Sequence, residues 1–283
     1  MAHSQHDREI EQLNNLLTLD VDHVEVLSWD YHETICYPRN ILSCCIRTGR
    51  ADNYYEDVTY GERLYLTPGW FCLIPQNTCT RFGRTLDTTS ITIHFSLEFS
   101  HGPDLYSGMK RGIRFYAPET VAALETCLRD PDKLRGACGI RGEVMRICFA
   151  HWPTPLPCSP EALAAYGPLF EYIRNRCTAS LNVAELAAQM GRRQDVFTRS
   201  FRKAFGITPH DYIRKALVRR ICARLSGDDR TIREIASDLE FSSEFYLSRF
   251  FKQNTGLSPR DYRARFGGNA SRLHKFTLPP YHG

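Results

Sequence analysis

Apolar and polar residues alternate through much of residues 21–116. The segment SITIHFSLEF is the clearest case, because every second side chain from Ile91 to Phe99 is apolar. A period of two predicts a β-strand with one apolar face. A turn signal at Thr67-Pro68-Gly69 and several short strand-like segments together predict a sandwich or barrel. The further segments of this kind are ILSCCIR (41–47), RLYL (63–66) and WFCLIP (70–75).

The pattern becomes helical after Pro118, where the segments ETVAALETCLRD and GEVMRICFAHW predict two helices. A stripe of the second helix predicts either a dimer seam or a cover for the sheet of the same chain. Four prolines between His151 and Pro160 then predict a stiff linker, since proline ends a helix. The members of the stripe are Val144, Ile147, Cys148 and Trp152.

The segment after the linker contains an internal repeat. Residues 185–212 align with residues 234–262, and both copies end on one phrase, GITPHDY from Gly206 and GLSPRDY from Gly256. Each copy predicts a short helix, a tight turn and a longer helix, which is the helix-turn-helix pattern. We expect the inner face of each longer helix to be core, through Val196, Phe197, Ser200 and Phe201 in the first copy and Phe245, Leu247, Phe250 and Phe251 in the second.

Capping signals fix the ends of these helices. Asn182 and Thr231 each precede a Glu by three residues, which predicts a capping box at the start of each short helix. Gly206 and Gly256 predict left-handed helix stops, and each is followed by a Thr or Ser cap and a Pro that restart a helix. The helix that begins after Gly206 has about 16 residues and spans about 25 Å, enough to separate two recognition helices by about one DNA turn.

Charge divides the chain at Glu161. From that residue onward there are 21 Lys and Arg against 12 Asp and Glu, whereas the residues before it hold 15 against 20. A basic C-terminal half on an acidic N-terminal half favours a polyanionic partner for the C-terminal half alone.

The overall composition is that of an ordinary soluble protein, with 42% hydrophobic and 24% charged residues among 283. No apolar run reaches the length of a membrane helix, and the first residues, MAHSQHDREIEQLNN, lack the apolar core of a signal peptide. Eleven cysteines without a CxxC pair predict reduced, mostly buried thiols rather than disulfides or a zinc site. We therefore expect a cytoplasmic protein without membrane attachment.

Two helix-turn-helix units joined by one long helix and ending in SRFFKQNTGLSPRDYR resemble the DNA-binding domain of the AraC/XylS family of transcription regulators, over about residues 165–266. The chain has Glu240-Phe241 where the family usually has Gly-Phe, and Arg193 where the family often has a Ser cap. A residue other than Gly at position 240 costs about 1 kcal/mol if φ is positive there. The resemblance implies DNA contacts from Arg193, Gln194, Asp195, Thr198 and Arg199, and from Ser243, Glu244, Phe245 and Arg249. Phe245 would pack on a thymine methyl or belong to the core.

The segment RLYLTPGWFCLIPQNTCTRF resembles a strand-turn-strand unit of the cupin-like sensor domain found in ligand-responsive members of that family. The resemblance implies a small-molecule effector, a homodimer and RNA polymerase as a partner. Analogy with the family makes a sugar or a related small metabolite our hypothesis for the effector, and aromatic side chains would stack on sugar faces. The expected ligand residues are Trp29, Tyr31, His32 and Arg47. The histidines show no metal-ligand spacing, so we expect no metal, cofactor or catalytic residue.

The predicted fold class is α+β and multidomain, with an N-terminal cupin-like β-barrel and helices, and a C-terminal all-α domain of two helix-turn-helix units. The expected divisions are an arm (1–19), an effector-sensing β domain (20–116), a helical dimerisation or connecting segment (117–152), a Pro-rich linker (153–164), the DNA-binding domain (165–266) and a tail (267–283). We expect a DNA-binding transcription regulator and not an enzyme. The alternatives are a DNA-repair or catalytic protein with a reactive Cys that uses this DNA-binding domain, and a regulator controlled by a protein partner.

Overall fold

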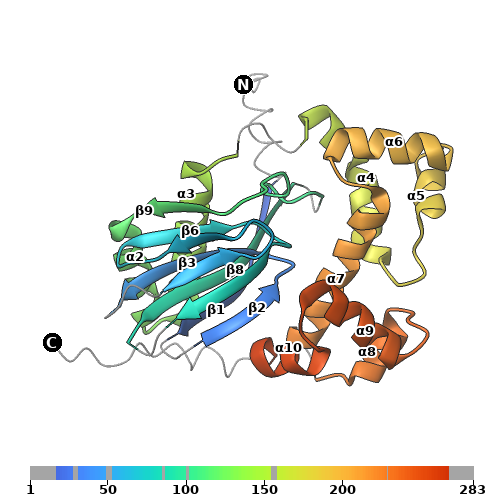
Figure 1. Cartoon of the computed structure of the whole chain (residues 1–283). Coiled ribbons are helices and arrows are strands. Elements are labelled where there is room, and N and C mark those ends of the chain that lie inside the picture. Colours follow the sequence, from blue (N-terminus) through green and yellow to red (C-terminus); the bar gives the residue numbers. More distant parts are fainter. Residues whose placement is uncertain are drawn as a thin grey trace.

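The computed structural model describes residues 17–27, 31–48, 53–84, 87–99, 102–153, 158–227 and 229–267. Figure 1 shows an N-terminal half built from sheets and two helices, beside a C-terminal half built from helices alone. The α+β class predicted from the sequence is therefore confirmed. Residues 1–16 of the arm expected at residues 1–19, most of the tail and Trp29 lie outside the described residues, whereas residues 17–19 belong to the first strand.

The strands form two antiparallel sheets rather than one closed ring. The five-stranded sheet has the order β1-β8-β3-β6-β9 and the four-stranded sheet the order β2-β7-β4-β5, and no strand is shared between the two in the described part of the chain. The predicted barrel is thus not closed by hydrogen bonds. The strands are β1 (Leu17–Leu27), β2 (Tyr31–Cys36), β3 (Asn40–Arg47), β4 (Tyr54–Asp57), β5 (Glu62–Tyr65), β6 (Trp70–Ile74), β7 (Cys79–Arg84), β8 (Thr89–Phe99) and β9 (Ile113–Tyr116).

Strand β8 is buried on both faces. Its apolar face carries Phe95, which packs edge-on against Tyr106 with 6.2 Å between the ring centroids, and the Tyr106 hydroxyl donates to the Cys148 carbonyl at 3.3 Å. The polar face carries Thr92 and His94, which are only 4% and 5% exposed. The alternation predicted the strand correctly, but its polar side chains face other parts of the protein and not solvent.

Two helices, α2 (Pro118–Arg129) and α3 (Lys133–Ala150), cover the five-stranded sheet through contacts with β3 and β1. Asp132 caps α3, because its carboxylate accepts from the backbone N–H groups of Leu134 and Arg135 at 3.0 and 3.2 Å. Val144 and Ile147 are buried. The stripe predicted as either a seam or a cover therefore covers the sheet of its own chain.

The C-terminal half begins with α4, which starts at Pro160 after the N-cap Ser159 and so includes the last residues of the segment expected to be a linker. Both repeated phrases act as predicted. Gly206 and Gly256 are left-handed, with φ of 71° and 79°. The helices are α4 (Pro160–Arg176), α5 (Val183–Gln189), α6 (Gln194–Phe205), α7 (Pro209–Gly227), α8 (Ile232–Asp238), α9 (Glu244–Thr255) and α10 (Pro259–Phe266).

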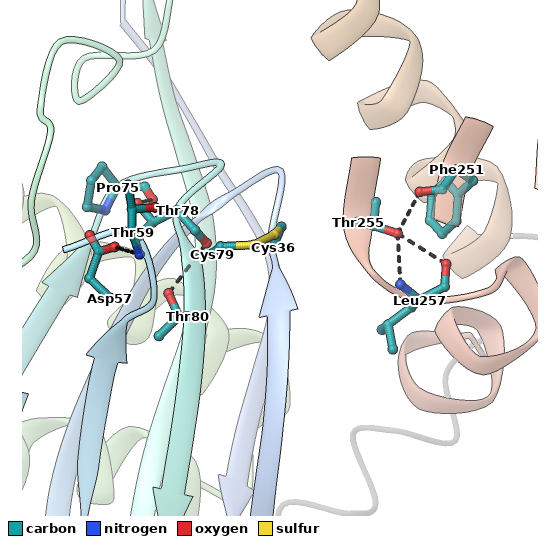
Figure 2. Close-up of a disulfide and its surroundings, with 10 residues drawn as sticks. All are labelled: Cys36, Asp57, Thr59, Pro75, Thr78, Cys79, Thr80, Phe251, Thr255 and Leu257. Atoms are coloured by element: carbon teal, nitrogen blue, oxygen red, sulfur yellow. Dashed lines mark hydrogen bonds between the residues drawn. A yellow bond between two sulfur atoms is a disulfide. The ribbon is translucent and has the colours of Figure 1, made fainter. Parts of the chain in front are cut away.

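A disulfide joins Cys36 to Cys79, where β2 and β7 pair directly. Figure 2 shows this bond at the end of β2, the strand that contacts α9. The expectation that all thiols are reduced is therefore wrong for this pair. The 43-residue separation gave no signal in the sequence, because only the register of the two strands brings the residues together.

Besides the contact of β2 with α9, the described residues of the two halves meet at several other places. Arg219 of α7 and Glu98 of β8 form an ion pair of 3.6 Å, with both side chains about 15% exposed. The ring of Phe266, at the end of α10, lies 5.7 Å from that of His94. Gly102 lies against Phe170 of α4, and a Cβ there would come within 2.7 Å of that ring. The sheets thus touch both ends of the helical half.

Within the described residues, none of the helices combines the length and the apolar character that crossing a lipid bilayer requires.

Candidate nucleic-acid interface

Helices α5 and α6 form the first candidate reading unit. The Asn182 side chain accepts from the Glu185 N–H at 3.0 Å, as a cap should. The capping box predicted here is incomplete, because the Glu185 carboxylate accepts from the Tyr172 hydroxyl of α4 instead. Gly191, with φ of 60°, makes the turn between the helices. The hydrogen bond between Glu185 and Tyr172 therefore links the first unit to α4.

Helix α6 has one buried and one exposed face. Phe197, Phe201 and Phe205 are buried and anchor the helix on its own unit. Val196, predicted to be core, is 42% exposed; it precedes Phe197 by one residue and therefore projects about 100° away. The exposed or half-buried positions include every predicted contact residue of this copy: Arg193, Gln194, Asp195, Thr198 and Arg199.

Asp195 lies between two arginines at the start of α6. Its carboxylate is 3.4 Å from the Arg193 guanidinium and 3.3 Å from that of Arg199. All three side chains are at least half exposed, so the pairs hold the arginines only loosely. Arg193 occupies the cap position without making a side-chain cap. Its guanidinium is 86% exposed and lies beside the Asp195 carboxylate at the start of the helix.

Helices α8 and α9 repeat this arrangement with better capping. Thr231 and Glu234 form the complete capping box that the sequence predicts, and the Ser243 hydroxyl caps α9 by accepting from the Tyr246 N–H at 3.1 Å. Leu247 and Phe251 are buried on the inner face. Because the two copies are offset by 50 residues here, Leu247 and Phe251 take the places of Phe197 and Phe201.

The outer face of α9 exposes an aromatic residue. Phe245 is 79% exposed, so the expectation that it is directed to the core is wrong and the other interpretation, an outward contact position, fits its place. Arg249 lies with its guanidinium carbon 5.6 Å from the centre of the Tyr246 ring. Tyr246 itself is 43% exposed. It was not among the predicted contact residues, and its counterpart in the first copy, Val196, was itself expected to be core.

The turn before α9 has a positive φ at the position where the family usually has a glycine. Glu240 has φ of 57°, as Gly191 has in the first copy. Its carboxylate accepts hydrogen bonds from the hydroxyl groups of Thr178, at 3.0 Å, and Ser180. These bonds lower the pKa of Glu240. The side chain that makes the turn less favourable thus links the second unit to the segment between α4 and α5.

A cleft of about 520 Å³ lies between the two halves. Its walls come from β1 and β8 on one side and from α4 and α7 on the other. Five arginines line it against two acidic residues, Asp20 and Glu98, and its apolar lining includes Phe170 and Ile173. The arginines are Arg39, Arg141, Arg174, Arg219 and Arg220.

Of the predicted effector residues, Tyr31, His32 and Arg47 do not line this cleft, and Trp29 is outside the described residues. Tyr31 and His32 belong to β2 and are described for their backbone only, and Arg47 is exposed at the end of β3. The structure therefore does not bring them together with the cleft. Among the described residues, no group of His, Cys, Asp and Glu has the arrangement of a metal site.

Comparison with known proteins gives the C-terminal half a family. A family model described as a helix-turn-helix domain matches residues 186–265. The regulatory protein SoxS of Salmonella typhimurium is 31% identical over 97 residues, which are 34% of this chain and 91% of SoxS. The transcriptional activator RhaR of Yersinia pestis is 33% identical over 66 residues, which are 23% of this chain and 23% of RhaR.

Among solved structures, ToxT from Vibrio cholerae matches 89% of this chain and all of its own with a TM-score of 0.58, at 11% sequence identity. That likeness extends over both halves and shows a shared fold. The helix-turn-helix match and the likeness to SoxS, of which this chain covers 91%, show that the chain is a sequence-specific DNA-binding transcription regulator. It belongs to the AraC/XylS family.

Proposed function

We propose that α5–α6 and α8–α9 are two helix-turn-helix units, and that α6 and α9 enter successive major grooves on one face of DNA. The observation that carries this proposal is the equivalence of Arg199 and Arg249. Each lies exposed two residues before a buried phenylalanine, Phe201 or Phe251. Helix α7, 19 residues long, separates the units by about 28 Å at 1.5 Å per residue, close to the ~34 Å of one DNA turn.

The exposed side chains suggest a role for each contact position. Arg199 and Arg249 have the paired donors that suit guanine, Gln194 has the one donor and one acceptor that suit adenine, and Glu244 can accept from cytosine. Arg193 and Ser243 lie at the starts of α6 and α9, where phosphates would pass, and Thr198 lies one turn further along α6. Asp195 holds the neighbouring arginines, and Phe245 packs on a thymine methyl. These assignments rest on the position and chemistry of each side chain, and those of Arg199 and Arg249 are expected to contribute most to affinity.

Replacing Arg199 or Arg249 by Ala should weaken binding to a selected DNA site by about tenfold to a hundredfold, since a bidentate base contact contributes about 1–3 kcal/mol. The site is first obtained by selection from random duplexes, and affinity is measured by fluorescence anisotropy at fixed salt. Arg129→Ala on α2 removes an equal charge far from both units and should leave affinity unchanged. Unchanged affinity in both test variants would overturn the assignment of the recognition helices.

We also propose that each segment of the chain has the role expected from the sequence. Residues 20–116 sense an effector, residues 117–152 connect or dimerise, residues 153–164 link, and residues 165–266 bind DNA, with homodimers and RNA polymerase as the working partners. The contacts from Glu98, His94 and Gly102 to the helical half support communication between these parts, because an effector bound between them would alter how α6 and α9 are presented.

For the effector, the cleft between the halves supports a small carboxylic acid with an apolar body. Guanidinium groups bind carboxylates through paired hydrogen bonds, and Phe170 and Ile173 offer apolar surface beside them. Structures of ToxT contain an unsaturated fatty acid and (E)-4-(8-methylnaphthalen-1-yl)but-3-enoic acid, both of this chemical class. A sugar held by Trp29, Tyr31, His32 and Arg47 is the alternative from the sequence.

Oleic acid should raise the melting temperature of the protein by a few degrees at concentrations well above its Kd, because a ligand that binds only the folded state stabilises it. Methyl oleate, which lacks the carboxylate, should not. Arg174→Ala should reduce the shift, whereas Arg176→Ala, on the same helix but outside the cleft lining, should keep it. Stabilisation by sugars alone would favour the alternative site, and stabilisation by neither class would favour control by a protein partner.

Most of the free thiols that the structure describes are buried, with Cys138 exposed and Cys127 partly buried. Burial of the others favours a regulator over the alternative of a repair enzyme with a reactive Cys. Burial raises the pKa of Cys148 to about 12 and those of Cys158 and Cys177 to about 11. A thiol with a raised pKa is largely protonated near pH 7 and therefore a poor nucleophile. We propose that the protein acts by binding alone.

A further inference from the structure

The Cys36–Cys79 disulfide fastens the end of an edge strand. Cys36 ends β2 and Cys79 begins β7, and the two residues pair directly across the strands. Strand β2 is the outer strand of the four-stranded sheet, with β7 as its neighbour. The end of such a strand opens more easily than the middle of a sheet, because backbone hydrogen bonds reach it from one side. The disulfide therefore secures a part of the sheet that is otherwise weakly held.

Both cysteines of this pair can be reached from solution. Cys36 and Cys79 are partly exposed, whereas most of the other cysteines in the described ranges are buried. Exchange between thiols and disulfides requires access to the sulfur atom that is attacked, and a neighbouring thiol makes the product reversible. The Cys36–Cys79 pair meets both conditions.

The residue after Cys36 packs against the helical half of the protein. Tyr37 is 4% exposed, and its ring lies 5.7 Å from that of Phe266 at the end of α10. The Tyr37 carbonyl accepts from the Asn77 N–H at 2.6 Å, which joins the turn after β2 to the turn before β7. A change at the disulfide is therefore one residue away from the contact with α10.

Strand β2 also contacts α9. Figure 2 shows the disulfide at the edge of the sheet, with Thr255 of α9 and the following Leu257 across from it. Thr255 is 1% exposed, and its hydroxyl donates to the Phe251 carbonyl at 2.9 Å, so this end of α9 is fixed within its own unit. The second DNA-binding unit thus rests on the sheet through α9 beside β2 and through α10 beside Tyr37.

A disulfide is unexpected in a protein that works on DNA. Compartments that hold DNA keep thiols reduced, and disulfides in them are usually transient and redox-sensing. We propose that Cys36 and Cys79 are a reversible redox modification site, which exchanges with small thiols and disulfides and sets how firmly the second DNA-binding unit is held on the sheet. This inference rests on the DNA recognition of the proposed function.

The exchange balances with a small disulfide such as oxidised glutathione as the oxidant. The thiolate of one cysteine attacks it, which releases one glutathione thiolate and leaves a mixed disulfide. The thiolate of the second cysteine then attacks the sulfur of the first, which forms the Cys36–Cys79 bond and releases the second glutathione. The two protons of the cysteine thiols pass to the two glutathione thiolates. Reduction by two molecules of glutathione runs the same steps in reverse.

Reduction should free the second unit to adjust to DNA. Without the disulfide the end of β2 opens more readily, and the contacts of β2 with α9 and of Tyr37 with Phe266 weaken with it. The ~28 Å spanned by α7 is short of the ~34 Å of one DNA turn, so a unit that stays docked on the sheet cannot shift to meet the second groove. We expect the reduced protein to bind a site that both units contact about fivefold more tightly, which is the lower end of typical coupling between two sites.

Equilibration of the full-length chain in glutathione buffers tests the modification. As the ratio of oxidised to reduced glutathione rises, the peptides that contain Cys36 and Cys79 should lose their free thiols together, measured by quenching, alkylation and mass spectrometry. Cys158 and Cys177, which are buried, should remain free thiols throughout. A pair that stays reduced, or stays oxidised, over the whole series overturns the proposal.

DNA binding tests the consequence of the exchange. Fluorescence anisotropy with the selected duplex should give about fivefold higher affinity for wild-type protein reduced by dithiothreitol than for oxidised protein. Cys36→Ser and Cys79→Ser should each have the affinity of the reduced protein under both conditions. Cys138→Ser, which removes an exposed thiol of α3, is the matched control and should respond as the wild type does. Circular dichroism checks folding, and the comparison of the two wild-type states needs no substitution.

Three results separate this inference from the DNA recognition on which it rests. Equal affinity of the oxidised and reduced wild type overturns the redox control, and so does a full response in Cys36→Ser. Tighter binding by the oxidised protein overturns the release of the second unit, because docking on the sheet would then support binding. Absence of sequence-specific binding in both states would instead contradict the proposed DNA recognition.

Discussion

Replacing Phe251 by Ala should lower the free energy of unfolding by about 3–5 kcal/mol and abolish specific DNA binding. The ring is fully buried on the inner face of α9 and packs edge-on against Tyr262 of α10, with 5.3 Å between centroids. Truncation of a buried phenylalanine loses the transfer free energy of the ring and leaves a cavity behind. The second unit would lose its anchor, and α9 could no longer be presented to a groove.

Phe245→Ala, six residues earlier on the same helix, is the matched control. Because that side chain is 79% exposed, its loss should change stability by no more than about 0.5 kcal/mol, while affinity for a selected DNA site should fall several-fold if the ring packs on a thymine methyl. Denaturant unfolding followed by circular dichroism and DNA anisotropy separate the two effects. A large stability loss from Phe245→Ala would show that α9 is rotated so that Phe245 faces the core and not the solvent.

What the sequence revealed best was encoded within a few residues. Gly206 and Gly256 stop helices because a left-handed conformation favours glycine, and the Thr231–Glu234 capping box requires only side chains three positions apart. These features gave the register of the repeat, and the register placed Arg199 and Arg249 on equivalent outward positions. Local rules therefore sufficed for most of the C-terminal half.

Features that depend on distant parts of the chain were missed or wrong. Val196 and Phe245 were expected to be core because they are apolar, yet only the packing of each unit decides which of several adjacent apolar residues turns inward. The Cys36–Cys79 disulfide depends on the pairing of β2 with β7. Likewise, the polar face of β8 is buried because the second sheet and α10 cover it, and alternation within one strand contains no information about such a cover.

The buried His94 should make the protein sensitive to acid. Burial lowers the pKa of His94 to about 3. The negative charge of Glu25 opposes this shift, and the positive charges of His23, Arg265 and Arg39 add to it. In the unfolded chain a histidine has a pKa near 6.5. Below pH ~6.5 the unfolded state therefore binds a proton that the folded state does not, and the free energy of unfolding falls by about 1.4 kcal/mol per pH unit down to about pH 3.

His94→Phe isolates this contribution. Between pH 6.5 and 5 the wild type should lose about 2 kcal/mol more stability than the variant in denaturant titrations. The contribution of Asp104 is common to both proteins: burial raises its pKa to about 6, which favours the folded state as pH falls. For Glu25, burial is outweighed by the hydrogen bond and charge of His23, which lower the pKa to about 2, so its contribution is lost only at lower pH. Parallel curves for wild type and variant would contradict the prediction.

Phe266 connects this titration to the contact between the halves. Its ring, at the end of α10, lies 5.2–5.7 Å from the rings of His23, Tyr37 and His94, so it helps to keep water from the imidazole. In Phe266→Ala, water reaches His94 and the pKa should return toward 6.5, visible as a titrating imidazole signal in NMR spectra between pH 8 and 5. In the wild type the same signal should stay constant over that range. A wild-type signal that titrates near pH 6.5 would mean that α10 does not stay docked on the sheet in solution. The contact between Phe266 and His94 could then not transmit a change from the N-terminal half to the second DNA-binding unit.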